Sequence, residues 1–406
     1  MIYSGIKKIS QILDRKAKRH YLILLLLLVI KSILDGFGLG LIAPFIAAIG
    51  QPSVIFDNEI FQYLNSFIGI RTSQELIIWM SIIMVSYFLI KNIFVLMTTY
   101  YQSRLLFTQR AFQSKRLFNS YMNAPYKYHL EHNSAELDRN IRYEIPNTYA
   151  FIDSMLHIAS NIFLVIAIFI ILIVASWQAV LSMTLVLSVT SFLILHFSGR
   201  FSNILGVQLQ RSQLQLGQAL KEGLSTIIES KLGNIESFFP KRYFKHYMVT
   251  SRSQWRQATI NSSPQLLFEL VAICILCGAI IILSLRQTDI ISLLPIIGLF
   301  AFAFVRLLPA VNLIVRNLNS LKFVLPAVNV VHQEFKKFQV TDNQAFNLDH
   351  PQKHSKDFSS IKFKDVSFSY ANPESNVIKN ITFQLNKGQS IAFIGPSGAG
   401  KTTISK

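Results

Sequence analysis

The chain has 406 residues, of which 51% are hydrophobic and 15% charged, and this composition is too apolar for an ordinary soluble protein of its size. Its 39 Lys and Arg residues against 21 Asp and Glu residues give a formal net charge of +18, which fits a nucleic acid, an anionic membrane surface or an anionic cargo. A membrane protein is therefore the first class to test, and the two cysteines, Cys274 and Cys277, lie in one apolar run, which excludes a disulfide framework.

Residues 1–20 have the pattern of a helix that lies along a membrane surface. Apolar residues recur at helical spacing up to Leu13, and lysines and arginines occupy the other faces. A segment that is simply basic and solvated is the alternative. The apolar run that begins at Tyr21 is too long for a signal peptide and lacks a small-residue cleavage site, so we predict a cytoplasmic interfacial helix that stays in the mature protein.

Six segments are apolar over the roughly 20 helical residues that a bilayer core requires. They are residues 21–49, 76–97, 155–175, 179–196, 266–285 and 290–313. We therefore predict that residues 21–339 form an all-α polytopic membrane domain. Basic residues crowd the segment before the first span, whereas the loop after it contains a single one, Arg71, so both chain ends are predicted to be cytoplasmic.

The segments after the second and fourth spans continue a helical pattern far beyond the length of a span. Short stretches rich in helix-breaking residues, at 123–133 and 232–240, interrupt them. We predict two helical prongs that enter the cytoplasm, turn through a short helix and return; a pair of soluble insertions is the alternative. The basic surplus lies mostly in these segments, where it faces anionic lipid, so we do not expect nucleic acid as a partner.

The chain becomes polar over residues 340–360, which we predict to be a linker between domains. Alternating and β-branched patterns then predict strands at residues 361–370, 377–385 and 389–394. Residues 361–406 therefore begin an α/β domain.

A glycine-rich motif follows the third predicted strand. Residues 395–402 read GPSGAGKT, which satisfies the pattern GxxxxGK[ST] in its required context after a strand. Glycines let backbone N–H groups converge on a triphosphate without adding bulk. Lys401 is predicted to reach the β- and γ-phosphates, and Thr402 to give its hydroxyl to Mg²⁺. A glycine-rich turn with an unrelated lysine is the alternative.

The sequence GPSGAGKTT at residues 395–403 resembles the phosphate loop of the ABC transporter superfamily, which typically reads GxSGxGKST. Thr402 replaces the commoner serine and keeps the hydroxyl. Tyr370, at the end of the strand FKDVSFSY, matches the aromatic residue that stacks on adenine in this family. The resemblance implies ATP and Mg²⁺ as ligands. The implied ATP-binding residues are Tyr370, Gly395, Ser397, Gly398, Ala399, Gly400, Lys401, Thr402 and Thr403.

Six spans with long cytoplasmic extensions resemble the exporter-type transmembrane domain of this superfamily. The resemblance implies a half-transporter of the cell membrane, in bacteria the inner membrane, that works as a homodimer or with a paired half-transporter. Residues 38–45 and 304–312 are similar to bacterial flippases of lipid-linked oligosaccharides, which implies an amphipathic, anionic, lipid-linked substrate. An exporter of peptides or hydrophobic drugs is the alternative.

No catalytic residue is expected within these 406 residues. The signature motif, the acidic magnesium ligand and the adjacent glutamate of the family do not occur before Lys406. We therefore expect a fragment of a working transporter, truncated after its phosphate loop, that does not hydrolyse ATP by itself. A truncated membrane protein that acts only by binding partners is the alternative of another class.

Five ionisable residues interrupt the predicted spans, where each charge is costly unless it has a partner or a function. They are Lys31, Asp35, Lys91, Glu269 and Arg306. One hypothesis pairs Lys31 with Asp35 and Arg306 with Glu269 and lets Lys91 reach the membrane surface. The other places Lys31, Lys91 and Arg306 in a substrate cavity that holds an anionic head group.

Overall fold

The computed structural model describes residues 2–41, 45, 56, 62–63, 69–70, 72–175, 177–285, 290–345, 359–369 and 377–405. Within these ranges, the side chains of residues 2, 39–40, 171–172, 174–175, 177–183, 275–276, 279–285, 290–304, 306 and 339–345 are not described. The chain divides into two compact units, Met1–Phe338 and Gln339–Lys406.

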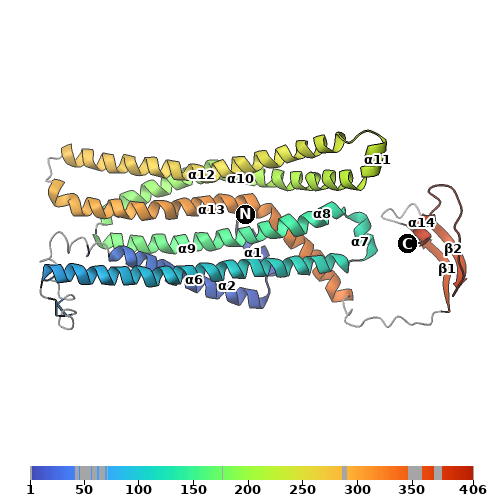
Figure 1. Ribbon diagram of the computed structural model, residues 1–406, viewed down its shortest axis with the longest axis horizontal. Coiled ribbons are helices and arrows are strands. Elements are labelled where there is room, and N and C mark those ends of the chain that lie inside the picture. The colour runs from blue at the N-terminus through green and yellow to red at the C-terminus, as the bar shows by residue number, and fades with distance from the viewer. Residues whose placement is uncertain are drawn as a thin grey trace. The chain divides into compact units, whose positions relative to one another are not determined.

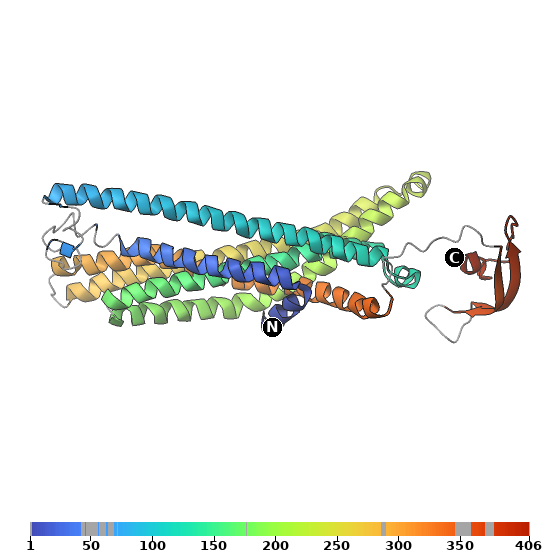
Figure 2. The ribbon, with the colours of Figure 1, turned by 90° about the horizontal axis from the view of Figure 1, so that it is seen from below.

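Long helices make up the first unit and run alongside one another (Figures 1 and 2). After the short α1 (Ile2–Ile12) come α2 (Arg15–Gly40), α6 (Ser73–Met122), α9 (Ile145–Ala175), α10 (Trp177–Ser225), α12 (Phe238–Leu285) and α13 (Ile290–Ala345). α2 packs against α6 and α9, and α10 packs along α12. The boundary between the two units falls within α13.

α6 is far longer than a bilayer requires. Its 50 residues make a helix of about 75 Å at about 1.5 Å per residue, against a hydrocarbon core of about 30 Å. A capping box fixes its start, because the Glu75 N–H donates to the Thr72 hydroxyl oxygen at 3.2 Å and the Thr72 N–H donates to the Glu75 carboxylate at 3.3 Å. The predicted helical extension beyond the span is therefore present.

Short helices occupy the turns between the long ones, as predicted. α7 (Tyr126–Glu131), α8 (Ser134–Arg139) and the π-helix η1 (Asn140–Glu144) connect α6 to α9. α11 (Ile227–Leu232) connects α10 to α12. It begins a few residues earlier than the breaker-rich stretch 232–240. The helix ends within that stretch, where Asn234 adopts a left-handed φ of +51° and the Ile235 N–H donates to the Ser230 carbonyl oxygen at 3.0 Å.

α1 turns its apolar face toward the protein. Ile9 and Ile12 are buried in the same cluster as Phe151 of α9 and Leu325 of α13, whereas Tyr3 lies 81% exposed. The amphipathic pattern that predicts a membrane-surface helix therefore also serves to attach α1 to the helix bundle. Its place at the membrane surface stays a prediction.

Two apolar cores hold the first unit together. The larger joins α1, α2, α6, α9 and α13 around fully buried side chains such as Leu24, Leu117 and Leu321. The other joins α9, α10, α12 and α13 around Phe268 and Leu307. Because both cores draw on α9 and α13, these two helices connect the halves of the bundle.

Four helices are long and apolar enough to cross a membrane, among the residues that the structure describes. They are Arg15–Gly38, Ser73–Met122, Ser134–Ile170 and Thr184–Ser225. The predicted fifth and sixth spans fall in α12 and α13, where many side chains lie outside the description. Six spans therefore stays a prediction.

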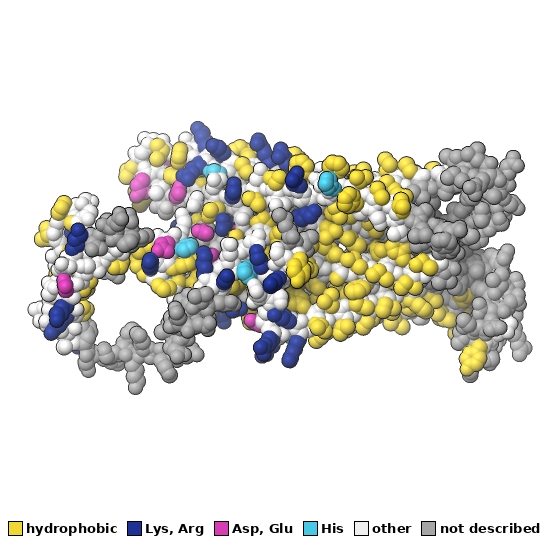
Figure 3. Space-filling view, turned by 180° about the vertical axis from the view of Figure 1, so that it is seen from behind, with side chains coloured by type: hydrophobic (Ala, Val, Ile, Leu, Met, Phe, Trp, Pro, Cys, Tyr) yellow, Lys and Arg dark blue, Asp and Glu magenta, His cyan; other side chains and the backbone are white. Residues whose placement is uncertain are grey.

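Hydrophobic side chains cover one half of the first unit, and Lys and Arg side chains gather over its other half (Figure 3). Ile33, Ile90 and Phe192 each lie more than half exposed. A continuous apolar surface of this extent is unstable in water, whereas the hydrocarbon of a bilayer covers it without penalty.

The second unit contains a two-stranded antiparallel sheet of β1 (Ser360–Phe368) and β2 (Ile378–Asn386), followed by the short helix α14 (Lys401–Ser405). The opposed residues Phe363 and Phe383 stack with their ring centroids 4.4 Å apart. Two of the three predicted strands are thus confirmed within a few residues.

The third predicted strand, at residues 389–394, is wrong as a strand for this structure. The segment leaves β2 without pairing to a described strand, and Ile394 is 94% exposed. A buried strand needs neighbours on its edges and cover on its faces. β1 and β2 pair with each other, and no described strand lies beside this segment.

Gly206 of α10 is required by close helix packing. A β-carbon there would overlap the carbonyl oxygen of Phe323 in α13, and a backbone atom cannot rotate away. We expect Gly206→Ala to destabilise the protein by about 1–3 kcal/mol through overpacking. Thermal unfolding in detergent measures the change.

Gly217→Ala, in the same helix, is the matched control. A β-carbon there would meet only the Ala135 β-carbon, at 4.0 Å, so alanine should leave stability equal or raise it by up to about 1 kcal/mol through helix propensity. Equal melting temperatures for Gly206→Ala and the unmodified protein would contradict the packing argument.

Candidate functional site

The glycine-rich segment forms a tight loop between residue 394 and α14. Gly398 and Gly400 have φ angles of +86° and +81°, in the left-handed region that glycine adopts without strain. A β-carbon on Gly400 would also approach the Val377 carbonyl oxygen to 3.0 Å. Both the backbone conformation and the space at Gly400 therefore require glycine.

Lys401 folds back over this loop. Its Nζ donates to the carbonyl oxygens of Gly395 and Pro396, at 2.7 Å each. The N–H groups of Thr403 and Ile404 donate to the Gly400 carbonyl oxygen at 3.0 and 3.1 Å, which starts α14 directly after the loop. An ammonium group and a helix N-terminus thus lie at one end of a glycine loop.

These groups suit a nucleoside triphosphate with a divalent cation. Glycines at the bends keep the loop free of side-chain bulk, the half-buried Lys401 carries the positive charge, and the exposed Thr402 presents a hydroxyl. The predicted residues of the loop lie together, from Gly395 to Thr403. Tyr370, predicted to stack on adenine, lies outside the described residues.

Residues 378–406 match the protein family described as ABC transporter. Among curated proteins, the chain is 22% identical to the ATP-dependent lipid A-core flippase of Albidiferax ferrireducens, over 89% of this chain and 62% of that protein. The proteins of the same name from Francisella novicida and Coxiella burnetii are 22% and 20% identical, over 71% and 80% of this chain and 48% and 54% of theirs.

The end of the chain is thus similar to the ABC transporter family, and most of its length is similar to flippases that are named as ATP-dependent. The chain spans about half the length of the curated relatives it matches. The residues matched to the ABC transporter family include the whole glycine-rich loop at 395–403. The resemblance to flippases rests on identities near 22%.

The charged residues of the predicted spans pair differently from the first hypothesis. Lys91 of α6 is buried, and its Nζ lies 2.9 Å from Asp35 Oδ1 of α2 and 4.9 Å from the centroid of the Phe88 ring. The prediction that Asp35 pairs with Lys31 is wrong, and so is the prediction that Lys91 extends to the membrane surface. Asp35 faces α6, and an opposite charge from a neighbouring helix neutralises it there.

The other predicted cavity residues are less defined. Lys31 is half-buried and makes no ion pair within the described part of the chain. Glu269 is exposed, and the side chain of Arg306 is outside the description, so their pairing stays a prediction.

Sequence reasoning missed a buried polar network at the end of the helix bundle. It centres on Glu334 of α13 and includes Tyr121, Tyr128, Asn140 and Glu144. The sequence feature that could have revealed it is Glu334, an acidic residue near Val330, Val331 and Phe335, shortly before the predicted linker.

Lys401→Met should weaken Mg-ATP binding by the full-length protein about tenfold or more, because hydrogen bonds to charged groups contribute about 1.5–3 kcal/mol. Titration with a fluorescent ATP analogue measures the affinity. Lys364→Met, an exposed lysine of β1, is the control and should bind normally. Equal affinities for the two variants would contradict the role of the loop.

Asp35→Asn should destabilise the protein by about 3–5 kcal/mol, because it leaves a buried lysine without its counter-charge. The double variant Asp35→Asn with Lys91→Met should recover much of the loss, since no uncompensated charge remains. Thermal unfolding in detergent compares them, with Lys31→Met as the control one turn away. A double variant as unstable as Asp35→Asn would refute the pairing.

Proposed function

We propose that the full-length protein is an ATP-driven half-transporter that exports or flips an amphipathic, anionic, lipid-linked substrate across a bacterial inner membrane. The observation that carries the proposal is one chain that joins a bundle of membrane-length apolar helices to an ABC-type phosphate loop. The relatives named lipid A-core flippases support a lipid substrate.

ATP and Mg²⁺ are the ligands of the second unit in this proposal. Residues 395–403 hold the phosphates through backbone N–H groups and Lys401, and Thr402 gives its hydroxyl to Mg²⁺. Tyr370 stacks on adenine. The energy of nucleotide binding and hydrolysis then drives the helices of the first unit between two arrangements.

The working form is a dimer, either of two identical chains or with a paired half-transporter. Support comes from the resemblance to exporter-type ABC half-transporters, in which two nucleotide-binding domains close on ATP together. Both chain ends lie in the cytoplasm in this proposal. Lys and Arg gather over the half of the first unit that hydrophobic side chains do not cover, and such residues are enriched on the cytoplasmic side of membrane proteins (Figure 3).

Lys31 and Arg306 are the residues we propose to contact the anionic head group. Asp35 already neutralises Lys91, so Lys91 serves to join α2 to α6 rather than to bind substrate. Lys31 is half-buried on α2, one turn from Asp35, and carries no ion pair in the described part of the chain. An unpaired ammonium at membrane depth is costly unless an anion reaches it.

Lys31→Ala should raise the concentration of rough-type lipopolysaccharide needed for half-maximal ATPase stimulation about tenfold, as expected for the loss of one charged contact. The measurement uses full-length protein in vesicles of phosphatidylethanolamine and phosphatidylglycerol. Lys16→Ala, an exposed lysine of the same helix before the span, is the control.

Three outcomes separate the possibilities. Unchanged stimulation in Lys31→Ala would remove Lys31 from the substrate site. Stimulation by apolar peptides or drugs but not by lipopolysaccharide would favour the peptide or drug exporter. A full-length protein without ATPase activity would contradict the transporter itself.

A further inference from the structure

Residues 329–338 of α13 form a junction with three other elements of the first unit, α1, α6 and α7. Lys8 of α1 donates to Asn329 at 2.7 Å, and Gln11 of α1 lies 2.6 Å from a ring nitrogen of His332. The Arg116 guanidinium of α6 lies 5.0 Å from the Phe335 ring centroid. This segment is therefore fixed to α1 and α6 before the chain leaves the unit.

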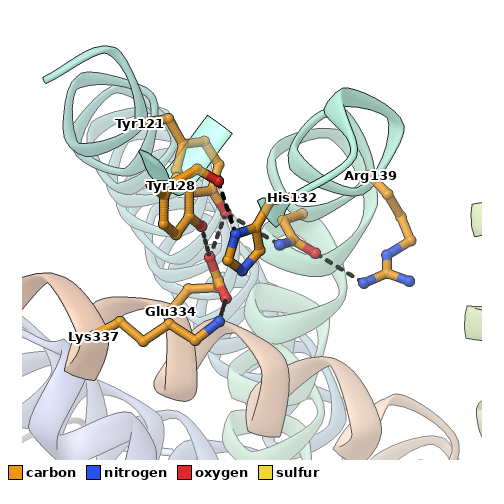
Figure 4. Close-up of polar contacts among 7 residues, drawn as sticks. Tyr121, Tyr128, His132, Arg139, Glu334 and Lys337 are labelled. Atoms are coloured by element: carbon orange, nitrogen blue, oxygen red, sulfur yellow. Dashed lines mark hydrogen bonds and ion pairs between the residues drawn. The ribbon is translucent and has the colours of Figure 1, made fainter. Parts of the chain in front are cut away.

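Glu334 is the centre of this junction (Figure 4). Its Oε2 accepts hydrogen bonds from the hydroxyl of Tyr121 in α6, at 3.0 Å, and from that of Tyr128 in α7, at 2.9 Å. Its Oε1 accepts from Lys337 Nζ at 2.8 Å. Only 4% of Glu334 is exposed, so these three donors replace the water that its carboxylate would otherwise bind.

Aromatic rings also pack against one another around Glu334. The ring of Tyr128 stacks on His132 with centroids 4.1 Å apart and meets Phe338 at 5.3 Å. Phe338 also meets the Tyr121 ring edge-on at 5.6 Å. Burial raises the pKa of Tyr128, and the negative charge of Glu334 raises it further, so the hydroxyl keeps its proton and remains a donor at neutral pH.

The polar contacts continue from Tyr121 into the rest of the bundle. Asn140 Nδ2 donates to the Tyr121 hydroxyl at 3.1 Å, and Arg139 donates to Asn140 Oδ1 at 3.1 Å. Arg139 forms an ion pair with Glu144 at 3.2 Å, and Gln210 of α10 donates to Glu144 at 3.0 Å. Asn140 and Glu144 bound the π-helix η1, an irregular turn that frequently marks functional sites.

Truncating one member of such a network leaves a buried group without its partner. The loss of one charged partner lowers the free energy of unfolding more than the loss of an exposed contact of the same length, because water cannot replace the missing partner. A network of this kind therefore tends to be either fully formed or broken. While it is formed, the helices that it joins move together.

Glu334 lies close to the point where the chain leaves the first unit. It lies within α13, and the boundary between the two units follows at Phe338. The chain that continues into the nucleotide-binding unit thus leaves from the segment that Glu334 holds. α7 belongs to the predicted prong between α6 and α9.

We propose that Glu334 is a positioning residue that joins the end of α13 to α6 and α7, so that these segments move as one rigid body during the transport cycle. The transport cycle in this statement rests on the proposed function. The rigid connection itself does not depend on transport and is measurable without it.

Spin labels test the proposal in the full-length protein, in nanodiscs of phosphatidylethanolamine and phosphatidylglycerol. The labels replace two exposed lysines, Lys127 of α7 and Lys336 of α13, after every native cysteine of the full-length protein, Cys274 and Cys277 among them, has been changed to alanine. Pulsed electron resonance then gives the distribution of distances between the labels, without nucleotide and after trapping with Mg-ATP and vanadate.

With Glu334 present, we expect one narrow distribution with the same mean in both states. Glu334→Gln keeps the size of the side chain but removes its charge and one acceptor, and should broaden the distribution in the nucleotide-free state. Trapping should then shift its mean by about 2 Å or more, the scale of helix displacements in switching proteins.

Glu131→Gln is the matched control, since Glu131 is an exposed carboxylate of α7 outside the network, and its distribution should stay narrow. Tyr128→Phe keeps the stacked ring and removes one hydroxyl, so it should broaden the distribution partly and decides the matter if Glu334→Gln does not fold. A distribution as narrow in Glu334→Gln and Tyr128→Phe as in the control would overturn the proposal. So would a shift on trapping while Glu334 is intact.

The nucleotide-free comparison separates the two proposals. A protein that hydrolyses no ATP but loses its narrow distribution in Glu334→Gln would refute the transporter and keep the junction. If ATPase activity depends on Lys401 but the distribution of label distances is the same with and without Glu334, the proposed transporter stands and the junction is refuted.

Discussion

A charge buried in an apolar helix bundle must find an opposite charge or several donors, because neither lipid nor packed side chains replace its water. This constraint determines the main polar contacts between helices of the first unit. Asp35 and Lys91 connect α2 to α6, and Glu334 connects α13 to α6 and α7. Apolar packing gives the bundle its stability, and these sparse polar contacts specify which helix faces meet.

The sequence predicts the helices well because their signals are local. The apolar runs that predict the first spans coincide with α2, α6 and α9, and a capping box of neighbouring residues, Thr72 and Glu75, begins α6. The same holds for the phosphate loop, where Gly398 and Gly400 have the left-handed conformations that their residue type allows. The bends of the loop therefore follow from residue types and spacing, whereas nucleotide contact by residues 395–403 stays a prediction.

Contacts between distant segments could not be predicted in the same way. Asp35 has Lys31 one turn away on its own helix, and that spacing predicts an ion pair between them. Asp35 pairs instead with Lys91 on the adjacent helix α6. Glu334 and Tyr121 are far apart in the chain, and helical periodicity does not reveal which faces oppose each other. Likewise, residues 389–394 have the composition of a buried strand, but a strand forms only where neighbours pair with it.

The uninterrupted length of α6 has a mechanical consequence. A rigid rod of about 75 Å that tilts by about 5° about one end displaces its other end by about 6–7 Å, which exceeds the rise of one helical turn. Figure 2 shows α6 as one long helix. Thr72 caps its beginning and Tyr121 lies in its final turn, so a slight tilt about the capped end would displace Tyr121, together with the Glu334 that it binds, by this larger distance. For a helix of this length, a rotation that is small at one end is therefore a large displacement at the other.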